Sequence, residues 1–178
     1  MPLTAFYEVS IPEGLEPFTV QEIYHRLGHE VQFLSTGTRQ RPGLLQFTYG
    51  GKAVNLLQLK TVLSPFQVLR FAVPRPKALM GHQNLQILLE QIRTVLRHSP
   101  VGTYRTIYLA AAGSESAVMQ RFAQEVATQL SLRVDPHEGD LLLRVRRPLD
   151  GSEGWEVLIR MAPRPLSVHS ISPRTKAR

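Results

Sequence analysis

The sequence predicts an α+β protein made of two successive two-layer units, in which helices cover one face of a sheet. Three observations carry this prediction. Residues 1–73 alternate between β-rich and amphipathic segments in the order βαββαβ, and residues 74–162 do so in the order αβαββ. Pro74, Arg75, Pro76 and Lys77 interrupt the periodic pattern between them. We therefore expect domains at 1–73 and 74–162, with a linker or tail at 163–178.

The first six elements have clear local signals. An alternating segment at 6–11 predicts a strand that ends at Pro12 and Gly14, and helical spacing over 15–27 predicts a helix that stops at Gly28. Later segments predict strands at 31–34, 44–49 and 68–73 and a short helix at 53–59. This order is the ferredoxin-like pattern, in which two helices cover a four-stranded sheet.

The second domain begins with an amphipathic segment. Leucine, isoleucine and valine recur at helical spacing over 85–96, and a second such helix is predicted from about Ser116 to Leu130. Strands are predicted at 104–110, 141–145 and 155–159. Beyond these, the residues lack periodicity and are rich in proline, serine and arginine, as in a linker or tail.

The positive charge is concentrated in the second part of the chain. The net charge is +7, and residues 1–62 hold five basic and five acidic side chains, which cancel. Residues 63–178 therefore carry the excess, with sixteen Lys or Arg against nine Asp or Glu, and arginine predominates among them. Because the arginine fork suits phosphate and stacks on bases, we expect a nucleic-acid partner; a solvated basic surface that only aids solubility is the alternative.

Several function classes lack their required residues. The chain has no cysteine, no G-x-G turn and no P-loop, so we expect no catalytic residue and no cofactor site within it. His25 and His29 are four apart, but Gly28 intervenes and no third ligand is suggested, so we expect no metal site. No apolar segment is long enough to cross a bilayer, which predicts a cytoplasmic protein without membrane association.

The candidate RNA contacts are mostly arginines. Arg75 and Lys77 are the strongest, because the neighbouring prolines stiffen the segment that displays them. Arg144 and Arg146 alternate and so share one sheet face, although such residues are equally often ordinary solvent-facing positions. Gly113 and Ser114 precede a helix whose N-terminus suits phosphate, while Ser114 or Ser116 is equally a simple N-cap. The full set of candidates is Arg70, Arg75, Lys77, Arg105, Gly113, Ser114, Arg121, Arg144, Arg146 and Arg164.

Longer segments resemble a known family. FYEVSIPEGLEPFTVQEI (6–23) is similar to the Pro-Gly-Leu-Glu opening of THUMP-containing RNA methyltransferases. RPKALMGHQNLQILLEQI (75–92), TYRTIYLAAAGSESAVMQRFAQEV (103–126), EGDLLLRVRR (138–147) and GWEVLIRMAPRPLSVH (154–169) resemble a THUMP domain in the order this family uses. The resemblance covers nearly the whole chain.

The resemblance implies recognition of tRNA by its single-stranded 3′ acceptor end, through candidates that include Arg75, Lys77, Arg105 and the Gly113–Ser114 turn. It also implies a methyltransferase domain that uses S-adenosylmethionine and carries an Asn/Asp-Pro-Pro motif, in cis or in trans; this sequence contains neither that domain nor the motif. Two alternatives stay open, since fold alone does not set function. One is a stand-alone tRNA-binding adaptor for another modifying enzyme, and the other is a small ferredoxin-like ligand-binding domain.

Overall fold

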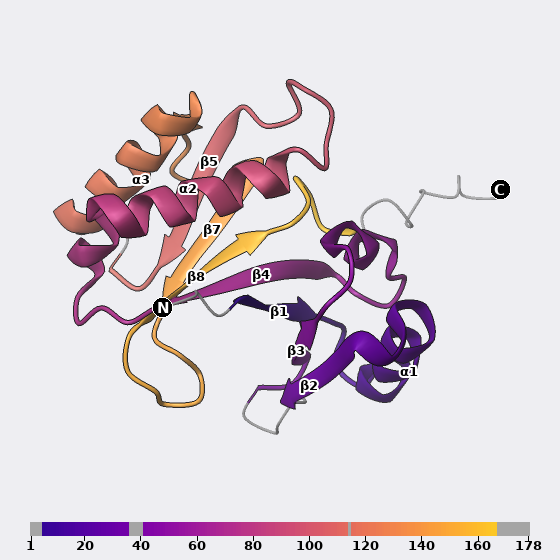
Figure 1. The fold of residues 1–178 in the computed structure, drawn as a ribbon. Helices are drawn as coiled ribbons and strands as arrows, with labels where there is room; N and C mark the ends of the chain where they lie inside the picture. Colours follow the sequence, from indigo (N-terminus) through magenta and orange to yellow (C-terminus); the bar gives the residue numbers. More distant parts are fainter. Residues whose placement is uncertain (1–4, 36–40, 114, 167–178) are drawn as a thin grey trace, which may run out of the picture. The chain divides into compact units, whose positions relative to one another are not determined.

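The computed structural model describes residues 5–35, 41–113 and 115–166, and the fold is α+β, as the sequence predicts. Its strands and helices follow in the chain order shown in Figure 1. The strands are β1 (Ala5–Ser10), β2 (Val31–Ser35), β3 (Leu44–Tyr49), β4 (Ser64–Phe71), β5 (Thr106–Ala111), β6 (Arg133–Val134), β7 (Leu141–Arg146) and β8 (Trp155–Arg160). The α-helices are α1 (Glu16–Leu27), α2 (His82–Leu96) and α3 (Ala117–Leu130), and the 3₁₀ helices are η1 (Gly28–Glu30), η2 (Ala53–Gln58) and η3 (Pro76–Met80).

The chain divides into two compact units. Within the described ranges, the larger unit contains residues 5–7 and 66–163, and the smaller contains residues 8–65 and 164–166. The units therefore divide after Pro65, so that most of β4 belongs with the later strands. The domain limits expected from the sequence, after residues 73 and 162, remain a prediction.

The smaller unit pairs β2 with β3 in antiparallel register and packs α1 by one face. Thr19, Ile23 and Leu27 are the buried residues of α1, which explains the helical spacing seen in the sequence. The segment predicted as a short helix at 53–59 is the 3₁₀ helix η2, with Leu56 buried. In a segment of six residues few hydrogen bonds offset the unfavourable nucleation of an α-helix, and the segment adopts the tighter 3₁₀ helix instead.

The larger unit places its strands in the hydrogen-bonded order β4-β8-β7-β5-β6. The pairs β4–β8 and β8–β7 are antiparallel, whereas β7–β5 and β5–β6 are parallel. Both α2 and α3 lie on the same face of these strands (Figure 1). Gln67 on β4 donates a hydrogen bond to Gln91 on α2 at 3.0 Å. Because side chains alternate along a strand, Phe66, Val68 and Arg70 point to the opposite face.

Local signals in the larger unit agree well with its observed helices. Ser116 is the N-cap of α3, since its hydroxyl accepts a hydrogen bond from the Met119 N–H at 3.3 Å. The short strand β6 was not expected from the sequence, because two residues show no periodicity. It forms because Arg133 and Val134 pair in parallel with Thr106 and Ile107 of β5.

Candidate nucleic-acid interface

One face of the larger unit is covered by neither α2 nor α3, and we call it the sheet face. Its floor is a cluster of buried apolar side chains to which neither α2 nor α3 contributes. Tyr108 and Ala110 of β5 pack against this floor and are partly buried. The floor residues are Phe6, Phe66, Val68, Leu142 and Leu158. Three of the candidate arginines, Arg70, Arg144 and Arg146, lie on this face.

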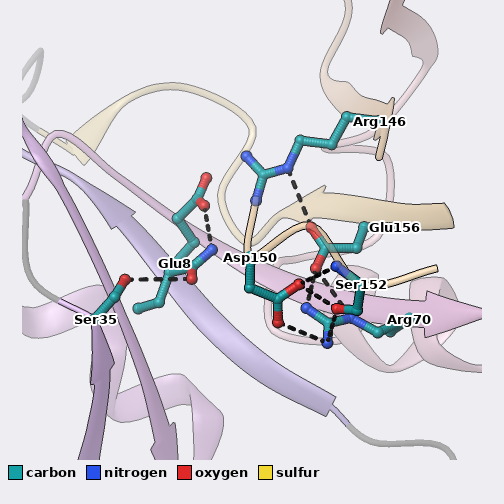
Figure 2. Close-up of polar contacts among 8 residues, drawn as sticks. Glu8, Ser35, Arg70, Arg146, Asp150, Ser152 and Glu156 are labelled. Carbon is teal, nitrogen blue, oxygen red and sulfur yellow. Dashed lines mark hydrogen bonds and ion pairs between the residues drawn. The ribbon is translucent and has the colours of Figure 1, made fainter. Parts of the chain in front are cut away.

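Arg70 and Arg146 share one buried carboxylate, that of Glu156 (Figure 2). Both arginines stand opposite Glu156 in the strand register, one on each neighbouring strand. Arg70 Nη2 lies 2.7 Å from Glu156 Oε1, and Arg146 Nε lies 3.1 Å from Oε2. The Glu156 side chain is fully buried, so each of its oxygens is satisfied by a cation. These two arginines therefore have a structural partner in the free protein.

Arg70 has further contacts at the loop that follows β7. Its Nη1 lies 3.2 Å from Asp150 Oδ2 and 3.2 Å from Ser152 Oγ, and Ser152 in turn donates to Asp150 (Figure 2). Burial acts to lower the pKa of Arg70, but hydrogen bonding and charge from Glu156, with a smaller part from Asp150, raise it above its usual value. Arg70 is consequently a fixed cation whose charge is largely balanced by carboxylates.

Arg144 differs from its two neighbours. It is exposed, and its guanidinium carbon lies 4.8 Å from the centre of the buried Phe66 ring. Within the described part of the chain no carboxylate is recorded within ion-pair distance of it. A guanidinium on an aromatic face keeps its outer surface and its N–H donors available. Arg144 and Arg146 do share one face, as their alternation predicts, but only Arg146 is tied to Glu156.

A second site lies where β8 begins. Arg147 stands with its guanidinium carbon 4.3 Å from the centre of the Trp155 ring, and its Nη1 donates to the Gly154 carbonyl at 3.0 Å. The Trp155 indole N–H donates to the Pro74 carbonyl at 3.4 Å. Beside this pair is a cavity of about 490 Å³, lined by Ala72, Val73, Pro74, Arg147, Glu153 and Gly154. We call it the Arg147 cavity.

The amino-acid sequence contains only a weak signal for this cavity. Arg147 belongs to the basic run that begins at Arg144, but nothing along the chain links it to Trp155, eight residues later. The turn between them and the pairing of β7 with β8 create the contact. The one tryptophan of the chain, at the start of a strand, was the only available hint.

Arg75 and Lys77 lie on the turn that continues from Pro74. Both are exposed; Arg75 directly precedes η3, whereas Lys77 is its second residue, and Leu79 of the same 3₁₀ helix is buried. The Ala78 N–H donates to the Arg75 carbonyl at 3.1 Å and closes the turn. In the described ranges no ion pair is recorded for either cation. Their backbone is thus fixed while their charges face solvent.

The remaining candidates do not gather on the sheet face. Arg105 precedes β5, is exposed, and donates from Nε to the Gly102 carbonyl at 3.4 Å. Arg121 is exposed on α3, and Gly113 is exposed in the turn before that helix with a positive φ of 71°. Arg164 is exposed and belongs to the smaller unit. Ser114 lies outside the described residues.

Residues 5–35, 41–113 and 115–166 contain no group of three or more His, Asp or Glu side chains that would hold a metal ion. They also contain no helix long and apolar enough to span a membrane. Among the residues that the structure describes, no third side chain joins His25 and His29 in such a group.

Two solved structures have a similar fold. The structure matches TrmN from Thermus thermophilus with a TM-score of 0.58 and 16% sequence identity, over 92% of this chain and 47% of that one. It also matches a 4-thiouridine synthetase, solved with RNA and bound ATP, with a TM-score of 0.46 and 14% identity, over 88% of this chain and 40% of that one. The chain thus spans about half the length of the TrmN chain. No protein-family model and no protein of curated function matches the sequence.

Proposed function

We propose that this chain binds tRNA and serves as the RNA-recognition part of a tRNA-modifying enzyme. The exposed pair Arg75 and Lys77 carries the proposal. Two cations on a proline-bounded turn, with no recorded partner in the described residues, meet the requirement for phosphate contact at low entropic cost. The fold shared with TrmN agrees with this assignment.

The finer proposal follows the family resemblance. It assigns the 3′ acceptor end of tRNA as the bound segment and an S-adenosylmethionine-dependent methyltransferase domain, in cis or in trans, as the catalyst. The described residues do not fit that cofactor themselves. The turn from β5 to α3 holds one glycine, Gly113, and the exposed Glu115 there would repel the carboxylate of S-adenosylmethionine. The cofactor therefore belongs to the catalytic domain, and this chain supplies RNA binding.

The direct test is fluorescence anisotropy with unmodified tRNA, either intact or trimmed of its 3′ CCA, over a salt series. Phosphate contacts give a linear fall of log K with log salt, and each contact contributes about 0.7–0.9 to the slope. We expect the double variant Arg75→Ala/Lys77→Ala to bind more weakly and to reduce the slope by about 1.4–1.8. Trimming the 3′ end should weaken binding by the wild-type protein.

A matched control uses Arg97, an exposed arginine just beyond the C-terminal end of α2. α2 has 15 residues, which corresponds to about 22 Å of helix between Arg97 and the end that follows the Lys77 turn. Arg97→Ala removes one cation of the same kind and should leave the 3′-end preference intact. Equal, weak binding of intact and trimmed tRNA by the wild type would reduce the assignment to generic basicity, and absence of any binding at low salt would overturn it.

A further inference from the structure

The Arg147 cavity has the features of a nucleobase site, which goes beyond phosphate contact. We propose that it binds one unpaired base of the RNA, stacked on the Arg147 guanidinium; the inference rests on the proposed RNA binding. Trp155 would act as a positioning residue that supports the guanidinium from behind. Glu153 would accept hydrogen bonds from the edge of the base.

The stacking surface is held in place before any ligand arrives. Arg147 is exposed, yet its guanidinium is fixed by the indole on one side and by the Gly154 carbonyl at 3.0 Å. The indole is itself anchored by its hydrogen bond to the Pro74 carbonyl. A planar cation held in this way loses little freedom when a base stacks on it, and Arg guanidinium planes are used in this manner by RNA-binding proteins.

The cavity has suitable size and walls. Its volume of about 490 Å³ falls within the ~300–1,000 Å³ typical of small-molecule sites. Gly154 has φ +103°, and a Cβ at that position would meet the Phe71 carbonyl oxygen at 2.4 Å, so only glycine allows this close approach. Ala72, Val73 and Pro74 supply an apolar wall against which the base would lie.

The polar groups at the cavity indicate which base fits. Glu153 is exposed and lines the cavity, and an ionised carboxylate only accepts hydrogen bonds. Guanine, cytosine and adenine carry an exocyclic amino group that donates, whereas uracil offers only its N3–H, which lies between two carbonyl oxygens that a carboxylate repels. The cavity should therefore favour an amino-bearing base. Phosphates on either side of that base would lie within reach of Arg75 and Lys77, because their turn continues directly from Pro74.

The test uses the single tryptophan of the chain, which gives one indole N–H signal in a ¹⁵N-labelled sample. We would titrate the full chain with a short single-stranded oligoribonucleotide and with each of the four nucleoside monophosphates. Binding of a base on Arg147 should shift the Trp155 signal, and GMP, CMP and AMP should shift it at lower concentration than UMP. Glu153→Gln should reduce that difference between bases.

Variants separate stacking from charge. Arg147→Lys keeps the charge but loses the planar group. If stacking on the guanidinium contributes as much as stacking on an aromatic side chain, the oligoribonucleotide should bind about 5- to 150-fold more weakly. Trp155→Phe should give a smaller loss, and Arg97→Ala should change only the charge-dependent part. Thermal melts of each variant establish that it is folded.

Failure of the base site can be distinguished from failure of the proposed RNA binding. If the wild type binds tRNA while Arg147→Lys and Trp155→Phe bind equally well and the indole signal does not move, the base site is wrong and the RNA-binding function stands. If the wild type binds no tRNA at low salt, both proposals are overturned together.

Discussion

Glu156 offers the sharpest test of how the sheet face is held together. Its side chain is fully buried, whereas Asp150, which binds the same arginine, has a side chain that is 58% exposed. We therefore expect Glu156→Gln to lower the free energy of unfolding substantially and Asp150→Asn to lower it very little. Each substitution removes one negative charge with little change of shape, so the pair is matched.

The magnitude follows from the contacts. Glu156 accepts from Arg70 at 2.7 and 3.2 Å and from Arg146 at 3.1 Å. Loss of one member of a buried charge pair costs about 3–5 kcal/mol. The side chains of Arg70 and Arg146 are 30% and 22% exposed, so water partly replaces the lost carboxylate. The amide also retains one acceptor oxygen. We expect Glu156→Gln to lower the free energy of unfolding by about 2–3 kcal/mol. Asp150→Asn, which breaks the exposed Arg70–Asp150 pair, should lower it by at most about 1 kcal/mol.

Urea unfolding followed by circular dichroism measures both losses in free energy of unfolding. The urea concentration at the midpoint of unfolding is compared between variants whose dependence of free energy on urea is the same. The argument would be refuted if Glu156→Gln cost less than about 0.5 kcal/mol, or if Asp150→Asn cost as much as Glu156→Gln. A double-mutant cycle between Arg146→Met and Glu156→Gln gives an independent check, because residues that share a buried contact show a coupling of about 0.5–3 kcal/mol.

Three other outcomes test separate parts of the fold. Ser116→Ala should lower the free energy of unfolding by about 1 kcal/mol in urea melts, because α3 loses its N-cap, and Ser116→Asp should not. Gly139→Ala should lower the free energy of unfolding by about 1–3 kcal/mol or more, because a Cβ there would meet the Tyr108 backbone nitrogen at 2.6 Å. A loss below about 0.5 kcal/mol would contradict that crowding. Burial acts to raise the pKa of Glu22, but hydrogen bonds from the Thr61 and Lys60 N–H groups and the Thr61 hydroxyl lower it overall. The contribution of ionised Glu22 to the free energy of unfolding is therefore complete above about pH 4.3 and is lost as pH falls through the lower folded-state pKa. Glu22→Gln should make the free energy of unfolding depend less on pH in that acid range.

Periodicity in the sequence was sufficient to predict every α-helix and every strand longer than two residues. It failed where local pattern and hydrogen bonding diverge. The segment at 53–59 has helical spacing but forms the 3₁₀ helix η2, and β6 is too short to show any pattern. β4 begins at Ser64, four residues earlier than expected, and Pro65 lies within the strand. Proline occupies strand positions where no ladder hydrogen bond is required from its nitrogen.

The candidate site was predicted less completely, because charges that are distant in sequence find their partners only through strand register. Arg70 and Arg146 look like free cations along the chain, and Glu156 looks like an ordinary surface residue. The pairing of β4, β8 and β7 brings the three into one row and buries the carboxylate. The same register leaves Arg144 opposite the apolar Leu158 instead of opposite an acid. No spacing rule distinguishes these two outcomes.

This division among the arginines bears on how RNA would be bound. An arginine that must first leave a buried carboxylate contributes less to binding than one that already faces solvent, because the unpaired carboxylate left behind carries a desolvation penalty. Arg75, Lys77 and Arg147 have no carboxylate partner among the described residues. Arg75 and Lys77 closely follow Pro74, and Arg147 stands over Trp155, whose indole N–H donates to the Pro74 carbonyl. Initial contact with RNA should therefore occur there, while Arg70 and Arg146 chiefly maintain the sheet. It follows that Glu156→Gln, which removes the negative charge that both arginines share, should destabilise the protein and at the same time strengthen RNA binding and steepen its salt dependence. If stability falls while RNA affinity and salt slope stay unchanged, Arg70 and Arg146 have a purely structural role.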